Sequence, residues 1–176
     1  MSFRRSVASV AAFAVFAVAV SSARVARATE QEWHAGGRAG IAVLSKTGVE
    51  PALDLHGGYG INDVFDATVE LLGSHHVSGS GTDVLSASAG VTYKIDVFQW
   101  IPYAGLLAGW YGYGGAPGPH GEHGSEFGAS VQLGVDYLVL RELAIGADVR
   151  WHASFRDGFS FPLFTATLGA EYRWGW

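Results

Sequence analysis

Cysteine is absent from the 176 residues, and lysine occurs only at Lys46 and Lys94. Without cysteine the fold contains no disulfide, so its stability must come from backbone pairing and burial. Charged residues make up 15% of the chain, whereas a typical soluble domain has about 25%. Soluble surfaces are normally built from lysine and glutamate, so we expect something other than water to cover much of this protein.

A hydrophobic run long enough for a membrane-spanning helix is also missing at the N-terminus. The apolar stretch at residues 7–20 has about 14 residues, short of the roughly 20 that cross a bilayer as a helix. Arg4 and Arg5 precede it, and Ala26-Arg27-Ala28 follows it. This is the pattern of a secretory signal peptide, so we predict a cleaved segment at residues 1–28 and one exported domain at residues 29–176.

Basic residues become scarce once that segment is removed. The remaining chain has 7 Arg and Lys residues against 16 Asp and Glu residues. Nucleic-acid binding needs a basic surface that neutralises phosphates. The exported domain is therefore not expected to bind nucleic acid.

The pattern that is present is a two-residue alternation of apolar and polar side chains, which is typical of β-strands with one apolar face. The last thirteen residues, from Phe164 to Trp176, alternate without a break. The pattern predicts eight strands, at residues 33–43, 49–59, 65–71, 85–94, 101–113, 126–137, 143–154 and 164–176. The facing of the fifth, at residues 101–113, is not determined by the pattern, because both of its faces are apolar or small.

Connection lengths and aromatic positions favour a transmembrane barrel over a soluble lipocalin-like barrel. The connections at residues 60–63, 95–99 and 139–142 are tight, whereas those at 44–48, 74–81, 114–125 and 155–161 are longer. Short turns at one end and longer loops at the other are typical of outer-membrane barrels. Aromatic residues also gather at the strand ends, as membrane interfaces select: Trp33, Tyr59, Tyr93, Trp100, Tyr137, Trp174 and Trp176 at the turn side, and Trp110 and Trp151 toward the loops.

With these features the chain resembles the small eight-stranded barrels of the outer membrane protein A and X type, from Trp33 to Trp176. The resemblance rests on the export signal, the eight alternating strands, the strand opening Ile101-Pro-Tyr-Ala-Gly105 and the aromatic C-terminus. It implies an all-β, antiparallel up-and-down transmembrane barrel that carries an assembly signal in its last strand. That signal, read by the barrel-assembly machinery, more often ends in Phe than in Trp.

The polar strand faces predict a filled lumen, because eight strands enclose a space that side chains can fill. A buried charge must be paired, so we predict an interior ion-pair network. Its predicted members are Arg38, Asp54, Glu70, Lys94, Asp136, Asp148, Arg150, Glu171 and Arg173. A narrow cation or proton path through the same groups is the alternative.

Catalysis and metal binding are weaker alternatives. His152 and Ser154 share a strand face, and Glu126 on the preceding strand completes a Ser/His/acid set that could attack an ester. His152-Ala-Ser154 is similar to the His-x-Ser-Asn stretch of lipid A deacylase, although Phe155 occupies the Asn position. His120 and His123, in a loop rich in Gly and Pro, have metal-ligand chemistry, but solvated loop residues are the simpler interpretation.

The sequence thus predicts an integral outer-membrane protein of a Gram-negative-type cell, with a structural or surface-interaction role and no bulk pore. We do not expect an enzyme, and we expect no cofactor. The expected partners are outer-membrane lipid and, during biogenesis, the assembly machinery. Since a closed barrel leaves no strand edge to pair, a monomer is expected.

Overall fold

The computed structural model describes residues 31–44, 48–75, 82–96, 98–115, 124–155 and 160–175. The predicted signal peptide lies outside these residues, as do Trp176, His120 and His123. Within them, no helix combines the length and the apolar character needed to span a membrane.

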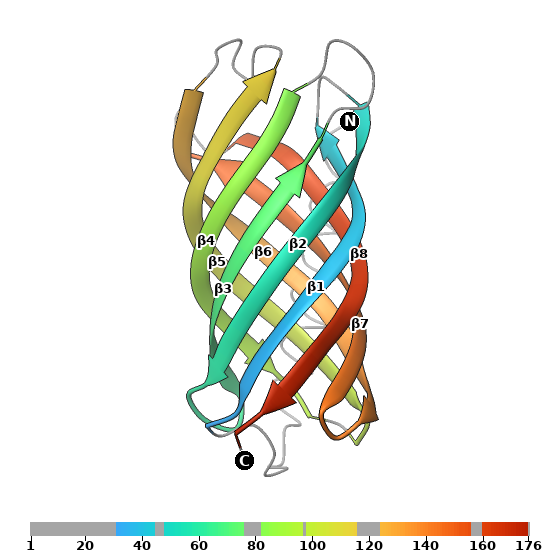
Figure 1. Ribbon diagram of the computed structural model, residues 1–176. Helices are drawn as coiled ribbons and strands as arrows, with labels where there is room; N and C mark the ends of the chain where they lie inside the picture. Colours follow the sequence, from blue (N-terminus) through green and yellow to red (C-terminus); the bar gives the residue numbers. More distant parts are fainter. Residues whose placement is uncertain are drawn as a thin grey trace, which may run out of the picture.

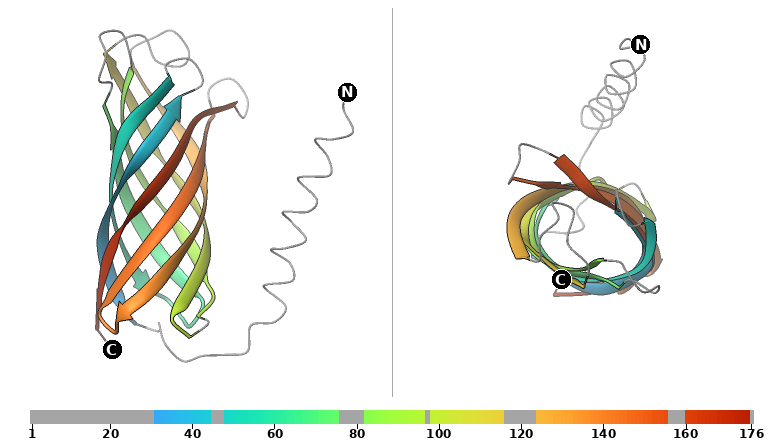
Figure 2. Two further views of the ribbon diagram at one scale, coloured as in Figure 1. Left: turned by 90° about the vertical axis from the view of Figure 1, so that its right-hand side faces the viewer. Right: turned by 90° about the horizontal axis from the view of Figure 1, so that it is seen from above.

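Eight antiparallel strands close into a single barrel (Figure 1). Each strand pairs with its neighbours in the chain, and the first pairs with the last, from Trp33 opposite Trp174 to Leu44 opposite Leu163. The end-on view in Figure 2 shows the resulting ring. The strands are β1 (Trp33–Leu44), β2 (Gly48–Gly60), β3 (Phe65–Ser74), β4 (Thr82–Lys94), β5 (Trp100–Gly115), β6 (Gly124–Leu140), β7 (Leu143–Ser154) and β8 (Ser160–Trp174). This confirms the predicted eight-stranded antiparallel barrel.

Short connections lie at the end of the barrel where β8 ends (Figure 1). In the turn between β2 and β3, the side-chain oxygen of Asn62 accepts hydrogen bonds from the backbone nitrogens of Val64 (3.0 Å) and Phe65 (2.9 Å). Asparagine favours tight turns for this reason. We call this end the turn side and the opposite end the loop side.

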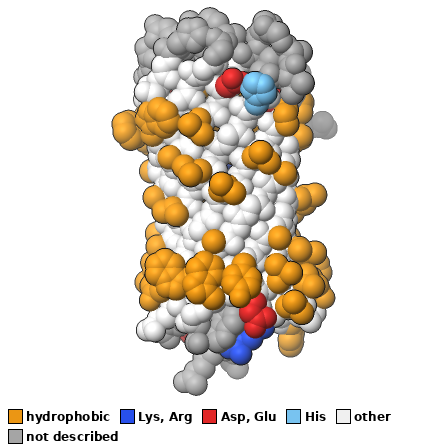
Figure 3. All heavy atoms as spheres, viewed as in Figure 1, with side chains coloured by type: hydrophobic (Ala, Val, Ile, Leu, Met, Phe, Trp, Pro, Cys, Tyr) orange, Lys and Arg blue, Asp and Glu red, His pale blue; other side chains and the backbone are white. Residues whose placement is uncertain are grey.

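The barrel has an apolar outer surface and a charged interior. Along β3 every second residue is buried, and the buried residues include Asp66 and Glu70 while Val69 and Leu71 are exposed. Figure 3 shows hydrophobic side chains gathered in two bands near the ends of the barrel, with almost no charged side chains between them. This inside-out arrangement suits a lipid environment, where the outer wall contacts hydrocarbon.

The facing of β5, which the sequence leaves undetermined, is clear in the structure. Ile101, Tyr103 and Leu107 are buried in the lumen, whereas Leu106 and Trp110 are exposed on the outer wall. Both faces are apolar because this part of the lumen is lined by aliphatic and tyrosine side chains. Hydrophobicity alone therefore does not distinguish inside from outside on this strand.

Candidate functional site: the charged lumen

All nine residues of the predicted interior network are buried in the lumen. His34, His56 and Asp66 are buried among them and share their ion pairs. We call this set of twelve the charged layer: Arg38, Asp54, Glu70, Lys94, Asp136, Asp148, Arg150, Glu171 and Arg173, with His34, His56 and Asp66. It contains six carboxylates against four Arg and Lys side chains, and Arg38, Arg150 and Arg173 each contact two or more acids.

Arg150 on β7 is the centre of the charged layer and is among the most deeply buried side chains in the described residues. Its Nη2 atom lies 2.6 Å from Asp54 Oδ2 and 2.6 Å from Asp148 Oδ2, and Nη1 contacts Glu70. The planar guanidinium presents five donors. One side chain thus holds carboxylates from β2, β3 and β7.

Asp148 joins this centre to the rest of the wall. Besides Arg150, its carboxylate accepts hydrogen bonds from Arg38 Nη1 (3.1 Å), Gln132 Nε2 (3.1 Å) and Thr167 Oγ1 (2.7 Å). The Arg38 guanidinium also lies 5.7 Å from the centre of the Tyr103 ring, within the range of a cation–π contact. Gln132, Thr167 and Tyr103 were not among the predicted site residues.

Toward the turn side, two histidines lie between carboxylates. His34 Nδ1 is 2.9 Å from Glu171 Oε2, and His34 Nε2 is 3.0 Å from Asp66 Oδ2, which Lys94 also contacts. His56 bridges the same Glu171 oxygen (3.3 Å) and Asp54 Oδ1 (3.5 Å). Each imidazole therefore lies within 3.5 Å of two acids.

The charged layer ends at the turn-side rim. Arg173 Nη2 lies 2.9 Å from Glu171 Oε1, and Arg173 Nη1 lies 4.0 Å from Glu32, just before β1. Burial raises the pKa of the Glu32 carboxyl more than the attraction of Arg173 and Lys94 lowers it. Burial likewise raises the pKa of Asp96 in the turn between β4 and β5.

Little open space remains between these side chains. A cavity of about 20 Å³ lies within the charged layer, lined by His34, Arg38, His56 and Glu70 among others. A water molecule needs roughly 10–15 Å³ of such space. This cavity therefore has room for about one water molecule and not for a hydrated ion.

Part of the lumen wall on the loop side is apolar, which the sequence did not predict. Ala42, Leu44, Ala52, Leu72, Val84 and Leu163 form a buried cluster, and Tyr113 packs against it. The predicted third strand ends at Leu71, so Leu72, which continues the inward face of Asp66 and Glu70, lies just beyond it.

The residues of the esterase alternative are held by other partners. His152 Nδ1 lies 3.0 Å from the Tyr111 hydroxyl, and His152 Nε2 lies 3.4 Å from Thr165 Oγ1. The Glu126 carboxylate accepts a hydrogen bond from the Tyr113 hydroxyl at 2.7 Å. Ser154 is buried in the lumen wall. These contacts are typical of a packed polar interior and do not favour catalysis.

Metal binding also finds no support in the described part of the chain. No group of three or more His, Cys, Asp or Glu side chains there is arranged to hold a metal ion. The carboxylates around His34 and His56 instead pair with Lys94, Arg150 and Arg173.

The predicted interface aromatics that the structure describes lie on the outer wall, and several of those at the turn side form pairs across neighbouring strands. The ring centroids are 4.7 Å apart for Trp33 and Tyr59 and 4.8 Å apart for Trp100 and Tyr137. Tyr93 pairs with Phe65, and Trp174 stacks on Tyr172. Toward the loop side, Trp151 contacts Phe164, and Trp110 is exposed.

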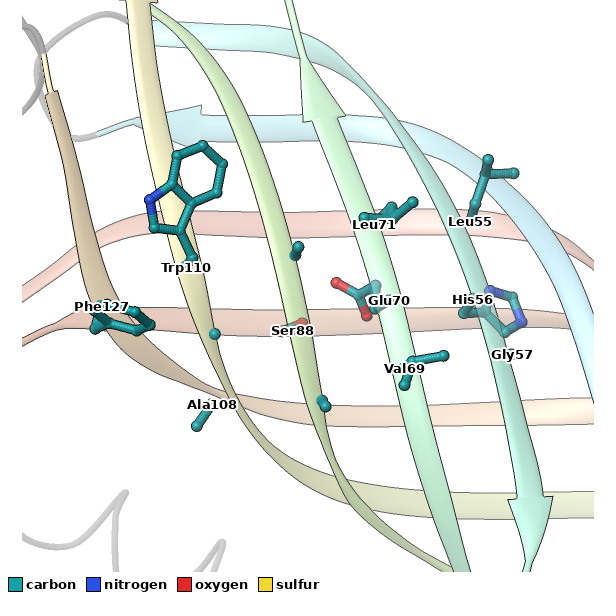
Figure 4. Close-up of a pocket in the computed structure, with 13 residues that line it drawn as sticks. Leu55, His56, Gly57, Val69, Glu70, Leu71, Ser88, Ala108, Trp110 and Phe127 are labelled. Carbon is teal, nitrogen blue, oxygen red and sulfur yellow. The ribbon is translucent and has the colours of Figure 1, made fainter.

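A hollow of about 590 Å³ also lies on the outer wall between β2 and β6 (Figure 4). Leu55, Leu71, Trp110 and Phe127 surround it, and small residues such as Ala108 line its floor. Its outer lining is apolar and lies in the lipid-facing wall. Acyl chains are therefore the material that would fill it.

Comparison with known proteins agrees with this geometry. Residues 8–173 match the family model for the outer membrane protein beta-barrel domain. A search among curated protein sequences finds no match. The matched region covers nearly all of the barrel.

Solved structures of small outer-membrane barrels share the fold. Neisserial surface protein A is 20% identical, with a TM-score of 0.61 over 82% of this chain and 96% of its own. OprG from Pseudomonas aeruginosa is 11% identical, with a TM-score of 0.61 over 85% of this chain and 99% of its own. Ail, the attachment invasion locus protein of Yersinia pestis, is 14% identical, with a TM-score of 0.54 over 83% of this chain and 100% of its own.

Proposed function

The chain belongs to the outer membrane protein beta-barrel domain family and lies in the outer membrane, and from that premise we propose that it is a structural and surface-interaction protein whose lumen admits no bulk solute. The observation that carries this proposal is the filled lumen. Arg150 and its three carboxylates span the interior, and the cavity beside them is about 20 Å³. A pore that carries solutes needs a continuous aqueous channel, as in larger barrels.

The connections between strands support the surface role. Those at the turn side are tight, whereas the loop-side connections include residues 116–123, with the sequence Ala-Pro-Gly-Pro-His-Gly-Glu-His. Outer-membrane barrels place their longer loops outside the cell. On the same fold, the name of Neisserial surface protein A describes a surface protein, and the name of the attachment invasion locus protein refers to attachment and invasion.

The proposal extends to biogenesis and assembly. Residues 1–28 serve as the export signal, and residues 29–176 are the barrel domain. The outward residues of β8, Leu168, Tyr172 and Trp174, are exposed at every second or fourth position, which is the spacing that the barrel-assembly machinery would read. Because β8 pairs with β1 along its length, no edge remains for strand pairing between copies, and the protein acts as a monomer in lipid.

Planar-bilayer recording tests the closed lumen. The refolded protein is expected to give no current steps at any applied voltage, with folding verified by its heat-modifiable migration in gels. Regular current steps from the wild-type chain would refute the proposal.

Cysteine labelling tests the surface role, because the chain has no cysteine of its own. Gly121→Cys in the 116–123 loop is expected to react with a membrane-impermeant maleimide on intact cells. Asp63→Cys, in the tight turn after β2, is the matched control and is expected to react only after the outer membrane is opened. Labelling of Asp63→Cys alone on intact cells would reverse the orientation and remove the basis for a surface role.

A further inference from the structure

The lumen has two levels of different chemistry. The charged layer extends to the turn-side rim, where Arg173 reaches Glu32. On its loop side lies the buried cluster that we call the apolar plug: Ala42, Leu44, Ala52, Leu72, Val84 and Leu163. The two levels adjoin, because Leu72 is opposite Asp54 in the pairing of β2 and β3.

The apolar plug covers most of the circumference. Its members come from β1, β2, β3, β4 and β8, and Tyr113 of β5 packs against it. Leu44 and Leu163 lie opposite each other across the β1–β8 seam. The plug therefore extends across the seam where the first and last strands meet.

The remaining wall at this level is polar, and several of its groups are hydrogen-bonded. The Tyr113 hydroxyl donates to Glu126, and Tyr111 and Thr165 contact the two nitrogens of His152. Other buried polar side chains at this end are Glu50, Ser74, Thr82 and Ser154. The tyrosine, threonine, histidine and Glu126 groups that already bond to one another are not free to replace the hydration shell of a passing ion.

The two levels present different barriers to an ion. Charged side chains bind water strongly. Once the ion pairs between them are weakened, they can therefore accommodate water and ions. An apolar constriction excludes water and gives an ion nothing to bind. The plug has no polar side chain of its own that could be rearranged for this purpose.

We propose that the apolar plug is the barrier that keeps this barrel from conducting ions, and that the charged layer beneath it is a blind, turn-side compartment. The inference rests on the proposed closed lumen. It goes further by naming the residues that close it. Loosening the charged layer alone then leaves the barrel closed, whereas removing the plug as well opens it.

A set of variants in planar bilayers separates the two levels. Arg150→Gln with Glu70→Gln loosens the charged layer and leaves the net charge unchanged, and this variant is expected to stay silent. Adding Leu72→Ser and Leu163→Ser is expected to produce discrete current steps. The matched control adds Leu71→Ser and Leu168→Ser, which lie on the outer wall, and is expected to stay silent.

The outcomes distinguish failure of the inference from failure of the proposed function. Current from the loosened variant with its plug intact would overturn the inference, as would silence of the folded variant that lacks Leu72 and Leu163. Current from the wild-type chain would instead overturn the closed lumen itself. If the serine variant gives no heat-modifiable folded form, Leu72→Ala with Leu163→Ala in the same background replaces it, with the same two outcomes.

Discussion

Arg150 Nη2 lies 2.6 Å from Asp54 Oδ2, and both side chains are almost completely removed from solvent. This contact joins β7 to β2 across the lumen, since neither strand pairs with the other in the sheet. Desolvating an ion pair costs several kcal/mol, which close contacts can offset. The charged layer therefore links opposite walls of the barrel through a few interdependent contacts.

We predict that Arg150→Met lowers the free energy of unfolding by about 3–5 kcal/mol, as is typical when one partner of a buried ion pair is removed. The change leaves Asp54, Glu70 and Asp148 close together without their common cation. Urea titration of the protein in lipid vesicles, followed by heat-modifiable migration, measures the loss.

The control for this prediction is Arg141→Met in the turn between β6 and β7, where the side chain is exposed. Surface substitutions usually change stability by no more than about 0.5 kcal/mol. Equal losses for Arg141→Met and Arg150→Met would show that the buried contacts are not the cause.

The aromatic pair of Trp100 and Tyr137 on the turn side is predicted to stabilise the barrel through a direct ring contact. Their centroids are 4.8 Å apart with the planes tilted by 58°, a geometry worth about 0.5–1.5 kcal/mol beyond burial. A double-mutant cycle with Trp100→Ala and Tyr137→Ala is expected to give a coupling energy in that range. Strictly additive losses would instead mean that each ring acts through lipid alone.

The fold could be predicted from the sequence because each strand carries its own signal. The alternation along β3 places Asp66, Thr68 and Glu70 on one face and Val69 and Leu71 on the other, whatever the neighbouring strands do. The structure buries the first three and exposes the other two. Local patterns of this kind determine the number of strands and which charged residues face inward.

The contacts inside the lumen could not be predicted because they depend on barrel closure. Arg38 and Asp148 are 110 residues apart in the chain, and they meet only because both point to the same height of the interior. Gln132 and Thr167 join them from β6 and β8. Strand register and the position around the ring determine such contacts, and alternation contains neither.

The pKa of Glu32 leads to a prediction about pH. Burial raises this pKa in the folded state. The contribution of the neutral carboxyl to the free energy of unfolding is therefore fully present below the unfolded pKa of about 4.3. It is lost as pH rises through the pKa of the folded state. Glu32→Gln resembles the neutral form and should be more stable than the wild type at pH 7. The urea midpoints of the two proteins should therefore differ at pH 7 and agree at pH 3.5. A stabilisation of equal size at both pH values would exclude ionisation of Glu32 as the cause.

Gly90 on β4 is predicted to be required for the close approach of β4 and β5. It lies opposite Leu107, and a Cβ atom there would overlap the backbone carbonyl oxygen of Leu106 and lie 2.6 Å from Leu107 Cα. Backbone atoms cannot rotate away as a flexible side chain can, so Gly90→Ala must separate the strands. We expect the free energy of unfolding to fall by about 1–3 kcal/mol, as for other overpacked sites.

Gly73→Ala on β3 is the matched control, because nothing lies within 4 Å of a Cβ there. That substitution restricts only the unfolded chain and should stabilise the barrel by about 0.4–1 kcal/mol. Urea unfolding in vesicles should thus shift in opposite directions for the two variants, and a Gly90→Ala barrel as stable as the wild type would mean that the strands do not approach this closely.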